Sequence, residues 1–315
     1  RRGAFMISCV CMNPALDKTI ELDGFTYGGL NRVQSAITDA AGKAVNVAIV
    51  LSRLGDKANL VGVNYKDGGD KVSARLTAEG VSSDFVWLDG ALRVNIKALD
   101  TRTGKITEIN ESGAPVTPEA LKSADAMIVR AAADSDYVVL TGSLPKGTDA
   151  GFYRREIERI GEKTDARCVL DCDGERLSEG IKAKPFLIKP NKYELGLLCG
   201  RELEDRSDIL HCAQEIARAG VKWVAVSMGG EGALIAGENE AYFAAALDVP
   251  VRSTVGAGDS MVAGLVHGFA LGGGAKAALR WGAACGNASV MTEGTRLIDT
   301  DAMPALLEQT VCERI

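Results

Sequence analysis

Histidine, positive charge and long apolar runs are scarce in this chain, and each shortage excludes a class of protein. Two histidines, His211 and His267, accompany eight cysteines, and no C-x-x-C pair occurs, so the clustered ligands of a zinc site are missing. Lys and Arg total 36 against 42 Asp and Glu, a formal net charge of −6, which argues against a nucleic-acid partner. No apolar run is long enough to span a bilayer, so we expect no membrane partner.

Two nucleotide-binding fingerprints are also missing. The chain has no G-x-x-x-x-G-K-[ST], which excludes a P-loop enzyme, and no G-x-G-x-x-G between an early strand and a helix, which disfavours a dinucleotide-dependent oxidoreductase. The N-terminal "RRGAF" lacks the apolar segment and cleavage site of a signal peptide, so we expect a cytoplasmic protein.

The cysteines lie in apolar surroundings such as "ISCVCM" and "ARCVLD". Buried cysteine usually behaves as a small hydrophobic residue with a free thiol. We therefore predict structural free thiols, with disulfides or metal binding as the alternatives.

Short apolar runs alternate with helical patterns through most of the sequence. The expected strands include "MISCVCM", "ANLVGV", "DYVVLTG", "ARCVLD", "PFLIKP" and "KWVAVSM", and "KAVNVAIVLSRLG" is an expected helix closed by Gly55. Strands separated by helices indicate an α/β fold with a mostly parallel central sheet and helices on both faces. In such sheets, ligands bind beyond the C-terminal ends of the strands.

Two early segments, about 13–33 and 90–113, break this pattern. Both are half-polar and carry Gly and Asp turns, and the second contains "DTRTG" between the alternating runs "RVNIKAL" and "KITEI", which predicts a hairpin. We interpret them as a small β lid within a single domain of 1–315. An antiparallel edge extension without a functional role is the alternative.

The stretch "STVGAGDSMVAGLVHGF" places small residues and an acid at the start of an apolar helix. Gly256, Ala257 and Gly258 allow an anion to approach unpaired backbone N–H groups at the positive end of the helix dipole. Asp259 in the first helical turn suits a general base that acts on an incoming hydroxyl during phosphoryl transfer. The alternative is that Asp259 only caps the helix.

A second motif, "IKPNKYELGLL", places Lys189 before Asn191 and Glu194. The last two lie on one face of a first helical turn, and their oxygens suit a hydrated magnesium ion. A capping box made by the same two residues is the alternative.

A Gly-rich turn and a set of polar residues complete the candidates. In "VSMGGEGALI", Ser227, Gly229 and Gly232 suit the phosphates or ribose of a nucleotide, with a simple hairpin as the alternative. Asp17 and Asn46 have the capacity to hold sugar hydroxyls. Cationic residues able to meet a phosphate on the substrate are Arg32, Lys43, Arg93 and Lys97; each is otherwise a solvated surface charge.

Together these motifs resemble the PfkB (ribokinase-like) family of carbohydrate kinases over nearly the whole chain. "STVGAGDSMVAG" is similar to the family's C-terminal motif and "AAGKAVNVAIVLSRLG" to its N-terminal one, while "KPNKYEL" and "SMGGEGAL" match nucleotide-side motifs. "CMNPALDKTIELDGF", "LNRV", "LRVNIKALD", "TEINESG" and "TGSLPKG" resemble the branch that phosphorylates ketohexose phosphates.

The resemblance implies a ribokinase-like fold and transfer from ATP, with Mg²⁺, to a sugar phosphate. Asp259 would be the base, with an anion hole formed by Gly256, Ala257 and Gly258. The sugar phosphate would be held by Asp17, Gly42, Asn46, Arg93 and Ser143, assisted by Lys43 and Arg32. The nucleotide and metal side would be formed by Lys189, Asn191, Glu194, Ser227, Gly229 and Gly232. A monovalent cation such as K⁺ would lie near Ser253, Val255 and Gly294, and the lid would pair two chains in a homodimer.

The sequence departs from the common family motif, and more than one sugar phosphate is a candidate acceptor. The family motif is commonly G-G-K-G-x-N, whereas this chain reads Ala41-Gly42-Lys43-Ala44-Val45-Asn46, so Ala44 adds a methyl near the sugar. Lys43 resembles the subgroups that use fructose 1-phosphate or tagatose 6-phosphate, whereas "EGTRL" resembles the subgroup that uses fructose 6-phosphate. Fructose 1-phosphate is the acceptor that we expect, with tagatose 6-phosphate as the first alternative. A sensor that binds a sugar phosphate without catalysis is disfavoured, because the base and anion hole are both present.

Overall fold

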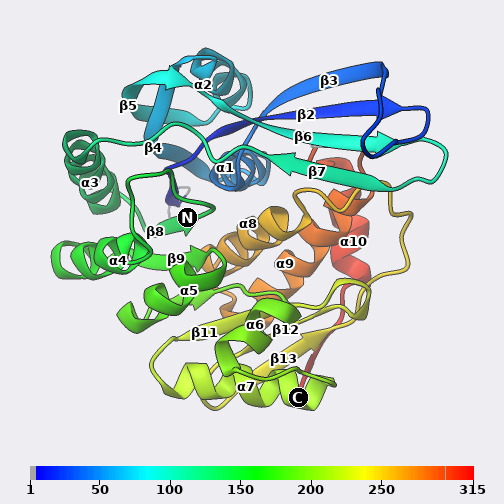
Figure 1. The fold of residues 1–315 in the computed structure, drawn as a ribbon. Coiled ribbons are helices and arrows are strands. Elements are labelled where there is room, and N and C mark those ends of the chain that lie inside the picture. The colour runs from blue at the N-terminus through cyan, green and yellow to red at the C-terminus, as the bar shows by residue number, and fades with distance from the viewer. Residues whose placement is uncertain (1–4, 295) are drawn as a thin grey trace.

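The computed structural model describes residues 5–294 and 296–315, and its largest feature is a ten-stranded sheet (Figure 1). In spatial order, its strands are β14 (Cys312–Arg314), β13 (Ala241–Ala244), β12 (Ala233–Ala236), β11 (Trp223–Ser227), β10 (Leu187–Ile188), β9 (Arg167–Asp171), β8 (Tyr137–Thr141), β1 (Met6–Cys11), β4 (Lys57–Asp67) and β5 (Ser82–Ala91). The seven strands from β11 to β5 are parallel, whereas β12, β13 and β14 are added antiparallel. The predicted α/β class with a mostly parallel sheet is confirmed.

Helices connect and cover these strands. They are α1 (Lys43–Arg53), α2 (Gly69–Ala78), α3 (Pro118–Ala133), α4 (Phe152–Lys163), α5 (Gly174–Gly180), α6 (Lys192–Cys199), α7 (Arg206–Arg218), α8 (Ala257–Ala270), α9 (Gly274–Val290) and α10 (Met303–Gln309). One group, α1, α8 and α9, packs together and against the large sheet. A second group, α3, α4 and α7, also packs on this sheet: α3 contacts β4, as α1 does, and α7 contacts β12, as α9 does. Within the described residues, no helix combines the length and the apolar character needed to span a bilayer.

A second, four-stranded sheet extends from the large one, at the upper right of Figure 1. Its order is β3 (Val33–Ala41), β2 (Ala15–Leu22), β6 (Arg93–Asp100) and β7 (Ile106–Asn110), and only β2 and β6 are parallel. Strands β6 and β7 form the hairpin expected around "DTRTG". Strand β3 lies beyond the expected boundary at residue 33, and residues 90–91 belong to β5 of the large sheet.

Helix α8 is held rigidly because glycines allow a close approach to α9. A Cβ on Gly264 would lie 2.5 Å from the Trp281 carbonyl oxygen, and one on Gly268 would lie 2.6 Å from Ala278 Cα. Nearly every residue of α8 is buried, and burial of such a helix is strongly stabilising. The first turn of α8 is therefore fixed relative to the sheet.

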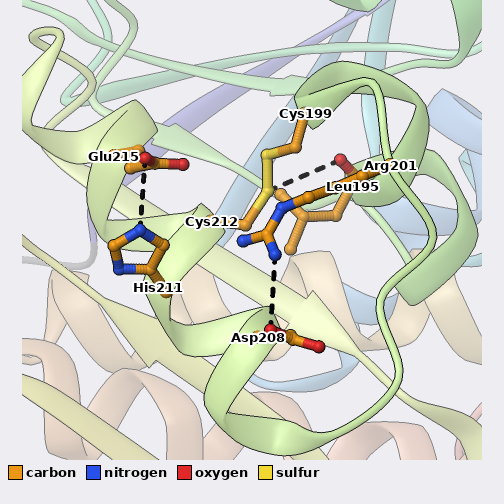
Figure 2. The surroundings of a disulfide bond; sticks show 7 residues. All are labelled: Leu195, Cys199, Arg201, Asp208, His211, Cys212 and Glu215. Atoms are coloured by element: carbon orange, nitrogen blue, oxygen red, sulfur yellow. Dashed lines mark hydrogen bonds and ion pairs between the residues drawn. A yellow bond between two sulfur atoms is a disulfide. The ribbon is translucent and has the colours of Figure 1, made fainter.

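The prediction of free thiols was wrong for two cysteines. Cys199 at the end of α6 and Cys212 in α7 form a disulfide, with Cα atoms 6.4 Å apart (Figure 2). Gly200 ends α6 in the left-handed conformation, and the short connection to α7 brings the two side chains together, a geometry that the sequence spacing did not reveal. The other six cysteines are free and buried, as expected.

Candidate active site

The first turn of α8 provides an anion-binding geometry at the edge of the large sheet. Gly256 precedes the helix with φ +78°, a conformation that favours glycine, and a Cβ there would lie 2.9 Å from Leu297 Cδ2. The Ala257 N–H makes only a long 3.4 Å contact with the Thr254 carbonyl. Donors at such a helix start are available to an anion.

Asp259 lies in this first turn and is buried, with 7% of its surface exposed. Its Oδ2 accepts a 2.8 Å hydrogen bond from Asn46 Nδ2 on α1. Burial raises the pKa of Asp259, while nearby Lys43 and Lys189 and the Asn46 hydrogen bond oppose that rise. A carboxylate with a raised pKa, aimed by a fixed amide, is suited to accept a proton.

Two lysines flank Asp259 and share one buried carboxylate. Asp171 at the end of β9 lies 3.4 Å from Lys43 Nζ and 3.2 Å from Lys189 Nζ, and it accepts a 3.0 Å hydrogen bond from Thr141 Oγ1. Burial alone would raise the pKa of Asp171, but the two ammonium groups and Thr141 outweigh it and lower the pKa to about 2. The pKa of Lys43 is raised, chiefly by Asp171.

Asp171 and Thr141 were missed by the sequence analysis. Both end apolar strands of the parallel sheet, "YVVLT" and "RCVLD". A polar residue at the C-terminal end of such a strand lies on the ligand-binding edge, so that position was the available signal.

A cavity of about 580 Å³ opens beside Lys43. Because it gathers residues that we expect on the sugar side, it is here called the acceptor cavity. Its lining combines residues of the large and small sheets: Cys11, Asn13, Lys43, Ala44, Arg93, Asn95, Asn110, Glu111, Ser112, Thr141, Gly142, Ser143, Leu144, Pro145, Lys146, Thr148, Cys172 and Asp173. Three residues expected on the sugar side, Lys43, Arg93 and Ser143, are therefore brought together.

Other residues expected on the sugar side lie next to this cavity or away from it. Asp17 is buried in β2, where its carboxylate accepts hydrogen bonds from Asn95 at 2.9 Å and Lys97 at 2.5 Å; Asn95 lines the cavity. Gly42 precedes α1 with φ +128°, which favours glycine. Arg32 is exposed between β2 and β3 and is not part of the cavity lining.

A second cavity, of about 310 Å³ and mostly apolar, here called the apolar cavity, lies beside the α8 N-terminus. Ser227, Gly229 and Gly232 line it together with Ala257 and Gly258. Apolar side chains, among them Leu247, Val249, Val251, Met261 and Val290, form much of the remaining wall. A Cβ built on Gly258 would lie 3.6 Å from Lys189 Nζ, so the lysine ammonium lies close to the Gly258 part of this cavity.

Asn191 and Glu194 form the capping box that was the alternative to a metal site. The Asn191 side chain accepts from the Glu194 N–H at 2.8 Å, and Glu194 Oε2 accepts from the Asn191 N–H at 2.8 Å. Glu194 also contributes to the raised pKa of Lys43, so its charge acts on the site. Among the described residues, no group of three His, Cys, Asp or Glu is arranged to hold a metal ion.

The three residues expected near a monovalent cation lie together. Ser253 Oγ donates to the Gly294 carbonyl at 3.2 Å and accepts from the Val255 N–H at 3.2 Å. Thr295, within the same "EGTRL" loop, lies outside the described residues.

Comparison with known proteins gives a consistent result. The family model described as pfkB family carbohydrate kinase matches residues 11–302. A 1-phosphofructokinase of Rhodobacter capsulatus is 37% identical over 267 residues, 84% of each chain, and one of Vibrio cholerae is 34% identical over 300 residues, 95% of this chain and 94% of that protein. The crystal structure of phosphofructokinase-2 from Escherichia coli in complex with potassium is 27% identical with a TM-score of 0.90, covering 96% of this chain and 98% of that one.

Proposed function

Because the chain belongs to the pfkB family of carbohydrate kinases, we propose that it transfers the γ-phosphoryl group of ATP to a hydroxyl of fructose 1-phosphate. The product is fructose 1,6-bisphosphate. The relatives named 1-phosphofructokinase, each matched over most of both chains, support this acceptor. Lys43 in the N-terminal motif favours this acceptor over fructose 6-phosphate.

The observation that carries the proposal is the position of Asp259. It follows Gly258, which lines the apolar cavity, and it bonds to Asn46 on α1, the helix whose Lys43 and Ala44 line the acceptor cavity. Its carboxylate is held by Asn46 and lies near Lys43 on the acceptor side and Lys189 on the other side. Asp259 removes the proton of the acceptor hydroxyl while that oxygen bonds to the γ-phosphorus and the bond to the ADP leaving oxygen breaks. The amides of Gly256, Ala257 and Gly258 stabilise the charge on the transferred group.

The residues around the apolar cavity fit ATP. The apolar wall suits a purine ring, the turn at Ser227, Gly229 and Gly232 suits the ribose and phosphates, and Lys189 is positioned for phosphate oxygens. Mg²⁺, when bound with ATP, neutralises phosphate charge and keeps much of its water shell, so it needs few protein ligands. Glu194 and Asn191 would contact that water shell.

A monovalent cation is the finer part of this proposal. The Ser253 hydroxyl and the Gly294 carbonyl place two oxygen atoms 3.2 Å apart, shortly before α8 begins, and the Val255 N–H donates to the same hydroxyl. Hard cations prefer oxygen ligands. The structure of the similar E. coli enzyme is described as a complex with potassium. We therefore expect K⁺ to raise activity.

We further propose that the four-stranded sheet is a lid over the acceptor cavity and the contact surface of a homodimer. Strands β6 and β7 supply Arg93, Asn95 and Asn110 to the cavity lining. The sheet and its 23–32 connection also expose large apolar side chains: Tyr27, Leu30, Val33, Ile37, Ile106 and Ile109. Exposed apolar patches of this kind usually mark an interface, and a second copy of the chain is the occupant we propose.

The dimer is tested by light scattering after size exclusion. Ile37→Lys and Ile109→Lys should convert a dimer to a monomer, whereas Leu271→Lys, at an equally exposed position at the end of α8, should not. A wild-type monomer at micromolar concentration contradicts this part of the proposal.

The function is tested by a coupled ADP-release assay with ATP and Mg²⁺. The acceptors are fructose 1-phosphate, fructose 6-phosphate, tagatose 6-phosphate and unphosphorylated fructose. The highest kcat/KM with fructose 1-phosphate is the expected result; preference for another ketohexose phosphate keeps the reaction and corrects the acceptor. No turnover on any of the four, with a sugar phosphate still bound, supports a sensor instead.

A further inference from the structure

The acceptor cavity has few N–H groups left to bind a phosphate. Arg93 is its most prominent cation, yet its guanidinium already donates to the Asn13 carbonyl at 3.2 and 3.1 Å, to Asn95 Oδ1 at 2.9 Å and to the Glu111 carbonyl at 3.3 Å. Arg93 therefore connects three parts of the cavity wall, at Asn13, Asn95 and Glu111. The guanidinium keeps its positive charge, but these contacts occupy most of its N–H donors.

The ammonium of Lys43 also interacts with carboxylates already. Its ammonium lies 3.4 Å from the buried Asp171 carboxylate, and the charges of Asp171, Asp259 and Glu194 all act to raise its pKa. A cation held among three carboxylates is positioned at the reacting end of the site. It is poorly placed to hold a second phosphate by itself.

Lys146, another cation of the cavity lining, differs from Arg93 and Lys43 in the contacts of its ammonium. Its side chain is exposed and lines the cavity, and among residues 5–294 and 296–315 no ion pair or side-chain hydrogen bond engages its ammonium. The two acids in the lining do not neutralise it, because Glu111 Oε2 accepts from the Val94 N–H at 2.8 Å and Asp173 pairs with Arg176.

The backbone that carries Lys146 is held in place. Its carbonyl accepts a 2.8 Å hydrogen bond from the Val116 N–H. The following Gly147 has φ +94°, and a Cβ there would lie 2.5 Å from the Val116 carbonyl oxygen, so only glycine fits. Thr148 Oγ1 donates to the Pro145 carbonyl at 2.5 Å. The turn 145–148 is therefore a rigid base from which one long cationic side chain extends.

We propose that Lys146 binds the phosphate group that the acceptor already carries and so selects phosphorylated over unphosphorylated sugars. The proposal rests on the proposed function. The Lys146 ammonium would donate to the phosphate, whereas the N–H groups of Arg93 and Lys43 already have other partners. A charge-assisted contact to phosphate is stronger than a neutral hydrogen bond.

The test compares Lys146→Met, Lys146→Arg and Lys146→Glu with Lys122→Met, a matched exposed lysine on α3 away from both cavities. We measure kcat and KM for fructose 1-phosphate, KM for ATP, and the Kd of fructose 1-phosphate by calorimetry without ATP. Lys146→Met should raise the KM and Kd of fructose 1-phosphate about tenfold, with kcat and the KM for ATP unchanged. Lys146→Arg should retain most of the affinity, Lys146→Glu should lose more than Lys146→Met, and Lys122→Met should match wild type.

The outcomes separate this inference from the proposed function. If Lys146→Met matches Lys122→Met in every constant, the Lys146 assignment is overturned and the kinase function stands. If wild type binds fructose 1-phosphate without turning it over, the kinase function fails, and the calorimetric Kd of the variants still decides the role of Lys146. If wild type does not bind fructose 1-phosphate, both are overturned for this acceptor.

Discussion

Asn46 Nδ2 donates to Asp259 Oδ2 at 2.8 Å, although 213 positions separate the two residues. The contact joins the start of α1, beside the acceptor cavity, to the first turn of α8, beside the apolar cavity. It fixes the direction of the Asp259 carboxylate relative to both helices. The predictions below depend on this contact and on the charges around it.

Asp259→Asn should lower kcat at least about a hundredfold while leaving the Kd of the sugar phosphate nearly unchanged, because the amide cannot accept the hydroxyl proton. Steady-state kinetics and calorimetry measure the two quantities. The control is Asp70→Asn, an exposed acid in the first turn of α2. Unchanged turnover in Asp259→Asn would rule out Asp259 as the base.

Asn46→Leu should shift the acidic limb of the kcat/KM pH profile to higher pH. The Asn46 hydrogen bond lowers the pKa of Asp259 against the raising effect of burial, so its loss raises that pKa further. The base is active as a carboxylate, and a higher pKa leaves less of it ionised at a given pH. Asn59→Leu, at a partly exposed position in β4, should leave the limb in place. A limb that does not move in Asn46→Leu would limit Asn46 to sugar binding.

Arg93→Ala should mainly raise the KM for the sugar phosphate and leave the KM for ATP unchanged. The substitution removes a cation from the acceptor cavity and releases the braced carbonyls of Asn13 and Glu111. Arg93→Lys keeps the charge without the planar fork, so it should restore activity only in part. A defect confined to ATP binding would contradict this placement of Arg93.

Asp171→Asn should destabilise the protein by about 3–5 kcal/mol, because it leaves the buried Lys189 without its charged partner. Urea unfolding at pH 7 measures the change. Asp173→Asn, which affects a pair between an exposed Asp173 and a partly buried Arg176, should cost no more than about 1 kcal/mol.

The stability difference between wild type and Asp171→Asn should also depend on pH. The pKa of Asp171 is lowered to about 2 in the folded protein, so its stabilisation is present above the ordinary aspartate pKa and is lost as the pH falls toward 2. The difference between wild type and Asp171→Asn should therefore narrow on acidification below pH ~4. A difference that stays constant would show that the charge of Asp171 is not what stabilises the fold.

Glu156→Gln should raise the melting temperature relative to wild type at pH 8 but much less at pH 5. Burial and the neighbouring Asp125 raise the pKa of Glu156 to about 8 against the opposing charge of Arg159, so the folded state retains a proton that the unfolded state releases. The stability of wild type therefore falls as the pH rises from about 4.5 toward 8. Calorimetry at both pH values measures the shift, and Glu158→Gln, on the exposed pair with Arg154, should show no such pH dependence.

The parallel part of the fold was predictable from short apolar runs. Strands such as "ISCVC" and "RCVLD" are buried on both faces, and uninterrupted apolar residues identify them. Strand β3 was missed because its first six residues are exposed, which leaves no alternating pattern to detect. The antiparallel β12, β13 and β14 were not separately predicted, because short runs such as "ALIA" and "AYFA" carry no information about direction.

Local backbone chemistry allowed the sequence to determine which residue types stand at the start of α8. Glycine at position 256 and the acid at 259 follow from the requirements of a left-handed residue and a helix N-terminus, which involve only neighbouring residues. Only the tertiary structure decided that Asn46 reaches Asp259, that Asp171 lies between Lys43 and Lys189, and that Cys199 meets Cys212. These contacts join residues on different elements, and their distances depend on how the helices and strands pack, which no local pattern specifies.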